Sequence, residues 1–483
     1  MNPEFDSWKI FTLVFLLTAI PVAIMIIWEK RSPYKTAAWI LALLLLPLFG
    51  VIFYLFFGQE FRKRKLFSRK GIKSLNKLRI LSSHQLKQIE QTILNTDSKV
   101  REKETLIRLL LNNSNALLTT GNRLKILEDG SDTFEAIFNA IRDAKHHIHI
   151  EYYIIANDKL GKKLKDILIE KSNEGVEVRI IIDDVGSWGL DKKYISELKS
   201  NGIEIYSFME VRFPRLTSRV NFRNHRKIII VDGKTGFTGG INFADRYLEG
   251  IKGIGPWRDI HLQIEGDAVI SLQVIFAADW FFVINENISG KKYFPPMQNY
   301  GGIPLQIAAS GPDSDWETIS QAFFAAIAGA RSRVYIVSPY LMPPIQIISA
   351  LITSALSNVD VRIVIPEKSD AHISKWSSFS YIEQLLEAGI RIYFYKSGFI
   401  HSKYIIVDDV FSSIGSTNLD FRSLETNFEV NAFMYDQEFT DKLAEIFMAD
   451  IHNSREIKLT EWTRRPWHVK LRESLAHIVS PML

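Results

Sequence analysis

The sequence predicts an α/β protein in which an N-terminal transmembrane helical hairpin precedes a duplicated α/β/α sandwich, whose two halves form a pseudo-dimer within one chain. Two observations lead to this prediction. Two long apolar runs lie in the first sixty residues, and after about residue 120 one order of strands and helices occurs twice. The chain has 483 residues, which is enough for two to three folded units.

The two apolar runs cover about residues 10–28 and 36–58. A membrane-spanning helix needs about 20 apolar residues at a rise of about 1.5 Å each, so both runs are long enough. Buried core helices are the alternative, but they rarely lack a polar face over this length. A cleavable signal peptide is disfavoured, because Trp28-Glu29-Lys30-Arg31 follows the first run where small residues would be needed. We therefore expect an uncleaved hairpin within residues 1–60.

The charge distribution predicts how this hairpin is oriented. Residues 1–82 hold 13 Lys and Arg against 4 Asp and Glu, a net charge of +9, so the rest of the chain is −4 within the total of +5. Much of the excess lies between Arg62 and Arg79. The positive-inside bias then predicts a multi-pass protein of the cytoplasmic membrane, with everything after the hairpin facing the cytoplasm.

The segment of residues 61–118 separates the hairpin from the duplicated part. Its basic cluster is either a solvated linker or a surface that attracts anionic lipid. Residues 83–115 are polar and read as helical, and they either link the two parts or pack on the second. The acidic balance of the remainder disfavours nucleic acid as a partner.

The duplicated part divides into residues 119–297 and 298–483. Strands alternate with helices in both, which is typical of an α/β sandwich rather than a helical bundle. Repetition of whole units of this size indicates an internal duplication. The predicted elements are a strand at 147–155, a helix at 160–173 and a strand at 178–183 in the first half, and a strand at 334–339, a helix at 345–356 and a strand at 361–366 in the second.

One polar motif occurs at equivalent points of both halves. It reads His-x-Lys-x-x-x-x-Asp and is followed by Gly-(Gly or Ser)-x-Asn at the same distance. A His and a Lys two positions apart on a strand point to the same face, so each half presents an imidazole beside an ammonium group. A single His on a strand is more often structural, but two complete copies predict a functional site. The motif residues are His225, Lys227, Asp232, Gly239, Gly240 and Asn242 in the first half, and His401, Lys403, Asp408, Gly415, Ser416 and Asn418 in the second.

These motifs resemble those of the phospholipase D superfamily and, more narrowly, of the bacterial cardiolipin synthases. The resemblance extends to the hairpin, to Trp257-Arg258-Asp259 and to Asn427-Phe428-Glu429. It implies a phospholipase D-type sandwich and a phosphatidyltransferase that makes cardiolipin and glycerol from two molecules of phosphatidylglycerol. Anionic phospholipids and the membrane are the partners that it implies, while the oligomeric state is not predicted.

The resemblance also implies roles for the motif residues. His225 is expected to attack phosphorus and form a phosphohistidine, and His401 to act as general acid and then as base. Asp259 and Glu429 are the expected orienting partners of the two imidazoles, although exposed strand carboxylates are their alternative. The residues expected to surround the phosphate oxygens are Lys227, Lys403, Asn242, Asn418, Gly239, Gly240 and Ser416.

The remaining predictions concern the motif Asp residues, the need for a metal or cofactor, and the difference between the two halves. Asp232 and Asp408 complete the motif but are interpreted as structural members that fix the strand end. The implied chemistry needs no metal and no cofactor, in keeping with a chain without cysteine and without clustered acid and His spacing. Gly240 stands where the second half has Ser416, so the two halves are not expected to do equal work.

The sequence leaves the acceptor open. Water in place of a lipid alcohol would make the protein a phospholipase D-type hydrolase, while a nuclease or a catalytically inactive membrane scaffold fits the sequence less well. An arginine-rich segment precedes the first motif and is interleaved with apolar residues, so it is predicted to meet anionic headgroups. Its members are Arg212, Arg215, Arg219, Arg223 and Arg226.

Overall fold

A computed structural model describes residues 3–28, 33–46, 49–51, 54, 85, 98–211, 221–296 and 299–483. The chain forms two compact units. The N-terminal unit consists of Met1–Arg69 with Val211–Phe222, and the main unit consists of Lys70–Glu210 with Arg223–Leu483.

The N-terminal unit contains the helices α1 (Pro3–Trp28) and α2 (Pro33–Leu45), which pack against each other. Ile26, Leu43 and Tyr54 form its small buried core. Among the residues that the structure describes, no helix is both long enough and apolar enough to cross a bilayer. Parts of the second apolar run and the basic cluster from Arg62 to Arg79 lie outside the described residues.

The main unit begins with α6 (Ser98–Arg101) and α7 (Glu104–Ser114), and the two halves follow. The first half contains β1 (Leu118–Leu127), α8 (Gly130–Asp143), β2 (His147–Tyr152), α9 (Lys159–Asn173), β3 (Glu177–Asp183), α10 (Lys192–Ser200), β4 (Glu204–Phe208), β5 (Lys227–Val231), β6 (Thr235–Gly239), α11 (Arg246–Glu249), β7 (Trp257–Arg258), β8 (His261–Glu265) and α12 (Ala268–Ile284). The second half contains β9 (Ile303–Ser310), α13 (Thr318–Ala328), β10 (Arg333–Val337), β11 (Leu341–Met342), α14 (Ile345–Leu356), β12 (Asp360–Pro366), α15 (His372–Ser380), α16 (Ile382–Glu387), β13 (Arg391–Tyr395), β14 (Phe399–Ile400), β15 (Tyr404–Val407), β16 (Phe411–Gly415), β17 (Leu419–Asp420), a π-helix (Arg422–Thr426), β18 (Glu429–Tyr435), α17 (Gln437–His452), β19 (Ser454–Ile457), α18 (Leu459–Thr463) and α19 (Trp467–Ile478), and the chain ends in a 3-10 turn (Ser480–Met482).

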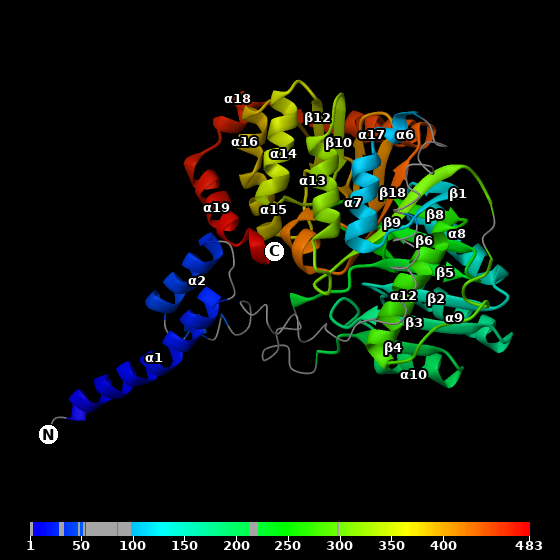
Figure 1. Ribbon diagram of the computed structural model, residues 1–483, viewed down its shortest axis with the longest axis horizontal. Helices are drawn as coiled ribbons and strands as arrows, with labels where there is room; N and C mark the ends of the chain where they lie inside the picture. The colour runs from blue at the N-terminus through cyan, green and yellow to red at the C-terminus, as the bar shows by residue number, and fades with distance from the viewer. Residues whose placement is uncertain are drawn as a thin grey trace. The chain divides into compact units, whose positions relative to one another are not determined.

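Most of the described strands of the main unit form one continuous 15-stranded sheet, while β11 with β17 and β14 with β7 form two separate two-stranded sheets. Figure 1 shows the strands of the large sheet running through the main unit. The order of the large sheet is β19-β13-β12-β10-β15-β16-β18-β9-β1-β8-β6-β5-β2-β3-β4. Antiparallel pairing of β1 with β9 joins the two halves. Parallel pairing occurs at equivalent places, among β2, β3 and β4 in one half and among β10, β12 and β13 in the other. The predicted duplication is therefore present in the topology.

Both faces of the sheet are covered by helices, as a sandwich requires. In β2, Ile148 belongs to the core under α8 and α9, whereas the adjacent His149 stacks on Phe276 of α12, with ring centroids 4.5 Å apart. Successive side chains of a strand point to opposite faces, so these contacts place helices on both sides. In the second half Tyr335 of β10 stacks on Phe447 of α17 at 4.6 Å.

The predicted strands and helices of the two halves are confirmed, but two of the strands end early. The strand predicted over 334–339 ends at Val337. The strand predicted over 147–155 ends at Tyr152. Beyond it the chain leaves β5 and bonds to the segment after β6: Ile154 N donates to Asn242 Oδ1 at 3.2 Å, and Ala156 N donates to Phe243 O at 2.8 Å. These bonds tie the segment after β2 to the motif Asn.

The segment before β1 packs on the main unit instead of forming a free linker. Helix α7 lies against α13 and β9 and buries the side chains of Leu106, Ile107, Leu110 and Leu111. Gln306 Nε2 of β9 donates to the carbonyl oxygens of Ile107 at 3.2 Å and Ala116 at 2.7 Å, which fixes the end of the helix. Residues 86–97 lie outside the described part of the chain.

Candidate active site

The two motif strands are joined to the opposite halves by short backbone ladders. His225 N donates to Phe428 O at 2.9 Å, directly beside Glu429. In the same way His401 N donates to Arg258 O at 2.7 Å, directly beside Asp259, and β14 pairs in parallel with β7. The segment that carries each His therefore lies next to the segment that carries the acidic residue of the other half.

The two imidazoles are consequently oriented across the halves. His225 Nδ1 lies 3.0 Å from both carboxylate oxygens of Glu429, and His401 Nδ1 lies 2.6 Å from Asp259 Oδ2. All four side chains are buried. The structure thus brings together both His residues and both expected orienting residues. Each acidic residue serves the His that its own half does not supply.

Burial decides the resting protonation state of the first pair. Desolvation lowers the pKa of His225 despite the opposing effect of Glu429. Burial alone would raise the pKa of Glu429, but His225 and Lys227 hold it below its usual value. A neutral imidazole that donates from Nδ1 to a carboxylate leaves the Nε2 lone pair free. His225 therefore has the protonation state of a nucleophile.

The second His shares its electrostatic environment with the first motif. Burial lowers the pKa of His401 well below its usual value, and Lys403, Lys227 and His225 lower it further. Groups of both motifs thus act on one imidazole, which places them in a common site. Because its basic form is favoured at rest, a protonated His401 would give up its proton readily.

The two motif lysines are buried beside their histidines. Lys227 Nζ donates to His225 O at 2.7 Å, and Lys403 Nζ donates to His401 O and lies 2.8 Å from His401 Nδ1. Desolvation lowers the pKa of Lys227 to about 7 and that of Lys403 to about 8. Buried ammonium groups are stabilised by a bound anion, so the pair is suited to a phosphodiester.

The two motif Asn residues have different surroundings. Both ends of the Asn242 amide are engaged: Oδ1 accepts from Ile154 N, and Nδ2 donates to Tyr247 Oη at 2.6 Å. Asn418 is also buried, but its Oδ1 has no hydrogen-bond partner within the described residues. In this state the Nδ2 group of Asn242 holds Tyr247, whose ring lies 6.1 Å from that of His401.

Asp232 and Asp408 lie at the far ends of the motif strands. Five residues of strand separate each from its lysine, roughly 16 Å at about 3.3 Å per residue. Asp232 accepts from the backbone N–H groups of Lys145, His146 and His147 at 2.8–3.0 Å. Asp408 accepts from the N–H groups of Arg331 and Ser332 in the same way. Both carboxylates hold the turn before the neighbouring strand.

The exchange of Gly240 for Ser416 has a steric explanation. A Cβ atom on Gly240 would lie 2.1 Å from Asp259 Oδ1, so only glycine leaves room for that carboxylate. In the second half the hydroxyl of Ser416 donates to Glu429 Oε2. In the first half Ile260 N donates to Asp259 Oδ1 at 2.8 Å instead. Glycine thus accompanies the shorter acid, and serine accompanies the longer one.

Two arginines beside the site were given no role in the site from the sequence. Arg246 and Arg422 each follow the motif Asn by four residues, and this shared spacing is the signal that could have found them. The guanidinium of Arg246 lies 5.4 Å from the ring of Trp257, which in turn lies 4.9 Å from the ring of His401. The Nε atom of Arg246 is buried without a hydrogen-bond partner among the described residues.

Both arginines act on the same aromatic side chain. Burial raises the pKa of Tyr153, and Arg422 and Arg246 are among the groups that oppose this shift. Tyr153 itself lies against His225, with ring centroids 5.0 Å apart. One arginine from each half thus lies close enough to act on the Tyr153 side chain beside His225.

The arginine-rich segment differs from its prediction where the structure describes it. Arg223 and Arg226 are buried rather than exposed to headgroups. Arg223 Nη1 pairs with Asp183 Oδ1 at 3.1 Å, and Arg226 pairs with Asp279 of α12. The headgroup prediction is therefore wrong for these two residues, because acidic side chains of the sheet and of α12 lie beneath them. Arg212, Arg215 and Arg219 lie outside the described residues.

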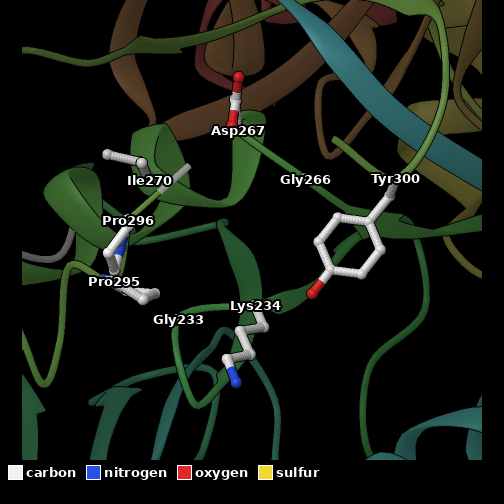
Figure 2. Close-up of a pocket in the computed structure, with 8 residues that line it drawn as sticks. All are labelled: Gly233, Lys234, Gly266, Asp267, Ile270, Pro295, Pro296 and Tyr300. Atoms are coloured by element: carbon white, nitrogen blue, oxygen red, sulfur yellow. The ribbon is translucent and has the colours of Figure 1, made fainter. Parts of the chain in front are cut away.

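Within the part of the chain that the structure describes, no group of three or more His, Asp or Glu side chains is placed to hold a metal ion. A shallow pocket lined by Lys234, Asp267 and Tyr300 contains none of the motif His or Lys residues (Figure 2). The chemistry available at the site is that of two imidazoles, two ammonium groups and two carboxylates.

Comparison with known proteins identifies the family. Residues 137–260 and 323–451 match the family model "Cardiolipin synthase, PLD-like domain", and residues 13–59 match "Phospholipase_D-nuclease N-terminal". The chain is 42% identical to cardiolipin synthase 2 of Bacillus anthracis, over 97% of this chain and 91% of that protein. It is 38% identical to the major cardiolipin synthase ClsA of Bacillus subtilis (strain 168), over 98% and 99% of the two chains.

A solved structure shares the fold. The crystal structure of phosphatidylserine synthase from Haemophilus influenzae matches with a TM-score of 0.60 and 15% identity, covering 80% of this chain and all of that one. With the duplicated topology and the matched family model, this similarity agrees with the architecture described above. The chain belongs to the cardiolipin synthase family of phospholipase D-like phosphatidyltransferases.

Proposed function

We propose that the protein is a cardiolipin synthase that transfers a phosphatidyl group from one phosphatidylglycerol to the terminal hydroxyl of another and releases glycerol. The observation that carries this proposal is the reciprocal pairing of His225 with Glu429 and of His401 with Asp259. It provides two differently held imidazoles in one buried site, which is what a two-step exchange at phosphorus requires.

The first step forms the covalent intermediate. Nε2 of neutral His225 attacks phosphorus, and the bond between phosphorus and the glycerol oxygen breaks. Protonated His401 gives its Nε2 proton to the departing alkoxide, so glycerol leaves neutral. Glu429 stabilises the positive charge that develops on His225, because it accepts the Nδ1–H bond throughout.

The second step reverses these roles with a new alcohol. Neutral His401 takes the proton from the hydroxyl of the second phosphatidylglycerol, whose oxygen attacks the phosphohistidine. The bond between phosphorus and Nε2 breaks, and cardiolipin leaves with His401 again protonated. Lys227 and Lys403 stabilise the non-bridging oxygens in both transition states. Asn418 can assist them if its Nδ2 group turns from the Asp420 side chain to a phosphate oxygen.

The acceptor also carries a phosphate, which the motif lysines cannot hold while they bind the reacting one. Arg246 and Arg422 are cations outside the motifs that act on Tyr153, the side chain beside His225. We assign them to the phosphate of the acceptor lipid. A requirement for this second charge would favour an anionic lipid over water as the acceptor.

The location of the reaction is proposed from the N-terminal part of the chain. We infer that residues 10–28 and 36–58 form a transmembrane hairpin and that the main unit faces the cytoplasm, on the grounds of two long apolar runs and the basic residues after them. Residues 13–59, which include most of both runs, also match the family model "Phospholipase_D-nuclease N-terminal". Since the chain contains no cysteine, single-cysteine variants can test this topology.

For this topology test, Ser32→Cys should react with a membrane-impermeant thiol reagent in intact cells. Ser200→Cys, at the exposed end of α10, should react only after the cells are permeabilised. Labelling of Ser200→Cys in intact cells would overturn the orientation. Equal labelling of both variants before permeabilisation would exclude the hairpin.

The activity itself is tested with purified protein and phosphatidylglycerol in mixed micelles that contain a chelator, followed by separation of the lipids. We expect cardiolipin and free glycerol from the wild type, and neither from His225→Ala. His452→Ala, which changes an exposed His at the end of α17, is the matched control and should remain active. Phosphatidic acid as the sole product would instead make the protein a hydrolase, and a loss of activity in chelator would contradict the metal-free mechanism.

A further inference from the structure

Helix α19 exposes a stripe of large apolar side chains near the end of the chain. Trp467, Leu471, Leu475 and Ile478 are 73%, 50%, 59% and 73% exposed. Their spacing of three to four residues places them on one face of the helix. The opposite face is fixed to the protein, since Ala476 and Glu473 are buried there.

The apolar surface continues beyond this helix. Met482 in the terminal turn is 54% exposed, and Ile373 of α15 is 50% exposed. Helices α15 and α19 contact each other, and Figure 1 shows both of them near the C-terminus. Scattered apolar residues on a surface need no explanation, but several large ones on one helix face, with others exposed on neighbouring elements, mark an interaction site. We call these six residues, Ile373, Trp467, Leu471, Leu475, Ile478 and Met482, the C-terminal apolar face.

The sequence that carries most of the C-terminal apolar face is rich in basic residues, of which Lys470 is paired with Glu383 of α16 at 3.4 Å. Residues 462–483 contain four basic residues and one acidic residue, whereas the chain after residue 82 is acidic overall. The acidic residue, Glu473, is buried in an ion pair with Arg465 at 2.5 Å. Arg464 and Arg472 are exposed beside the apolar stripe. Apolar side chains flanked by exposed cations are complementary to the interface of an anionic bilayer.

The C-terminal apolar face is connected to one wall of the active site. Asp370, two residues before α15, accepts from Tyr340 Oη at 3.0 Å, and Ser378 of α15 accepts from Leu341 N at 3.1 Å. Leu341 lies in β11, which pairs with β17, the strand that directly follows Asn418. The helix pair α15 and α19 therefore packs on the strands that position the second half of the site.

We propose that the C-terminal apolar face docks the main unit onto a bilayer of anionic phospholipid, as a membrane contact separate from the N-terminal helices. The partner is the lipid surface itself, with the apolar side chains among the acyl chains and Arg464 and Arg472 at the phosphates. Docking through α15 and α19 brings the wall of the site that carries Asn418 to the surface where lipid substrates lie. This surface follows from exposure and charge, and does not depend on which alcohol accepts the phosphatidyl group.

The absence of cysteine from the chain permits a direct test. A nitroxide is attached to Leu475→Cys in the full-length protein, reconstituted in vesicles of phosphatidylglycerol and phosphatidylcholine. Relaxation by oxygen, which concentrates in acyl chains, is compared with relaxation by a water-soluble nickel chelate. We expect oxygen to be the more effective relaxer at this position, by severalfold. The matched control is Lys162→Cys on the exposed side of α9, where the nickel chelate should be the more effective.

A second variant separates docking from misfolding. In the Leu475→Cys background, Trp467→Glu is combined with Leu471→Glu. The nickel chelate should then relax the nitroxide more effectively than oxygen does, while Tm is not lowered. The proposal is overturned if the Leu475→Cys nitroxide of the otherwise unchanged protein is reached mainly by the chelate. It is equally overturned if that nitroxide is shielded from both relaxers, because a protein surface, from this chain or a second copy, would then cover the helix.

Discussion

Replacement of Gly240 by alanine is expected to damage the active site without changing any group that takes part in the reaction. The added Cβ would lie 2.1 Å from Asp259 Oδ1 and 2.7 Å from Asp259 Cγ. A tolerable contact is about 3.2 Å or more, so the carboxylate has to move by about 1 Å. The bond from His401 Nδ1 to Asp259 Oδ2 is 2.6 Å long, and a displacement of this size ends it.

The loss of one hydrogen bond to a charged group corresponds to about 1.5–3 kcal/mol. If that amount is lost only in the transition state, kcat falls about 10-fold to 150-fold. The assay is the initial rate of cardiolipin formation from phosphatidylglycerol, measured together with Tm. Gly302→Ala is the matched control, because a Cβ at that position would meet nothing within 4 Å. A folded Gly240→Ala protein with more than half of the wild-type kcat would refute the steric reasoning.

Three further outcomes are expected. Burial lowers the pKa of Lys227 to about 7 and that of Lys403 to about 8. Because the protonated lysines bind phosphate, kcat/KM should fall as pH rises through 7–8. A pH profile of kcat/KM that stays flat to pH 10 would contradict this. Arg246→Gln should lower the rate of cardiolipin synthesis about tenfold or more. The exchange of labelled glycerol into phosphatidylglycerol should be spared, because the acceptor glycerol carries no phosphate. Equal loss of both activities would indicate a structural role for Arg246. Asp232→Ala should reduce the free energy of unfolding in denaturant by about 1.5–3 kcal/mol, because three backbone N–H groups lose their acceptor. An unchanged midpoint of the unfolding transition would argue against this capping role.

The chemical groups of the site could be predicted from the sequence because a strand has a period of two. That period places His225 beside Lys227, and the duplication shows that His401 and Lys403 repeat the arrangement. The pairing of each His with the acidic residue of the other half could not be predicted. It depends on backbone contacts such as the one between His225 and Phe428, which are 203 residues apart in the chain and leave no local pattern.

Local patterns also suggested more symmetry than the structure has. Asn242 and Asn418 occupy the same motif position, yet Tyr247 takes the amide of the first, while the residue at the equivalent distance from the second is Ser423. Arg226 belongs to an apparently exposed basic run, but Asp279 of α12 lies beneath it. In both cases the environment of the side chain is set by a partner in another turn or element. A motif or a charge run in the sequence does not include that partner.

The differences between the two His environments agree with different roles in one reaction. Glu429 accepts from His225 and from the hydroxyl of Ser416, so its carboxylate is fixed and its pKa stays below the usual value. Such an acceptor keeps the Nδ1–H tautomer of His225 in place, as a nucleophile requires. Burial instead raises the pKa of Asp259.

The pair of Asp259 and His401 is correspondingly closer to sharing its proton than the first pair. Lys403 Nζ, 2.8 Å from His401 Nδ1, adds a positive charge that makes a protonated imidazole a stronger acid. A group that gives and takes a proton in successive steps must lose that proton readily in the first step, and the lowered pKa of His401 favours this loss. The combination of glycine with aspartate in one half and of serine with glutamate in the other thus supports His225 as nucleophile and His401 as the proton carrier. Because each acid comes from the opposite half, either half alone would lack the partner that sets the state of its own imidazole.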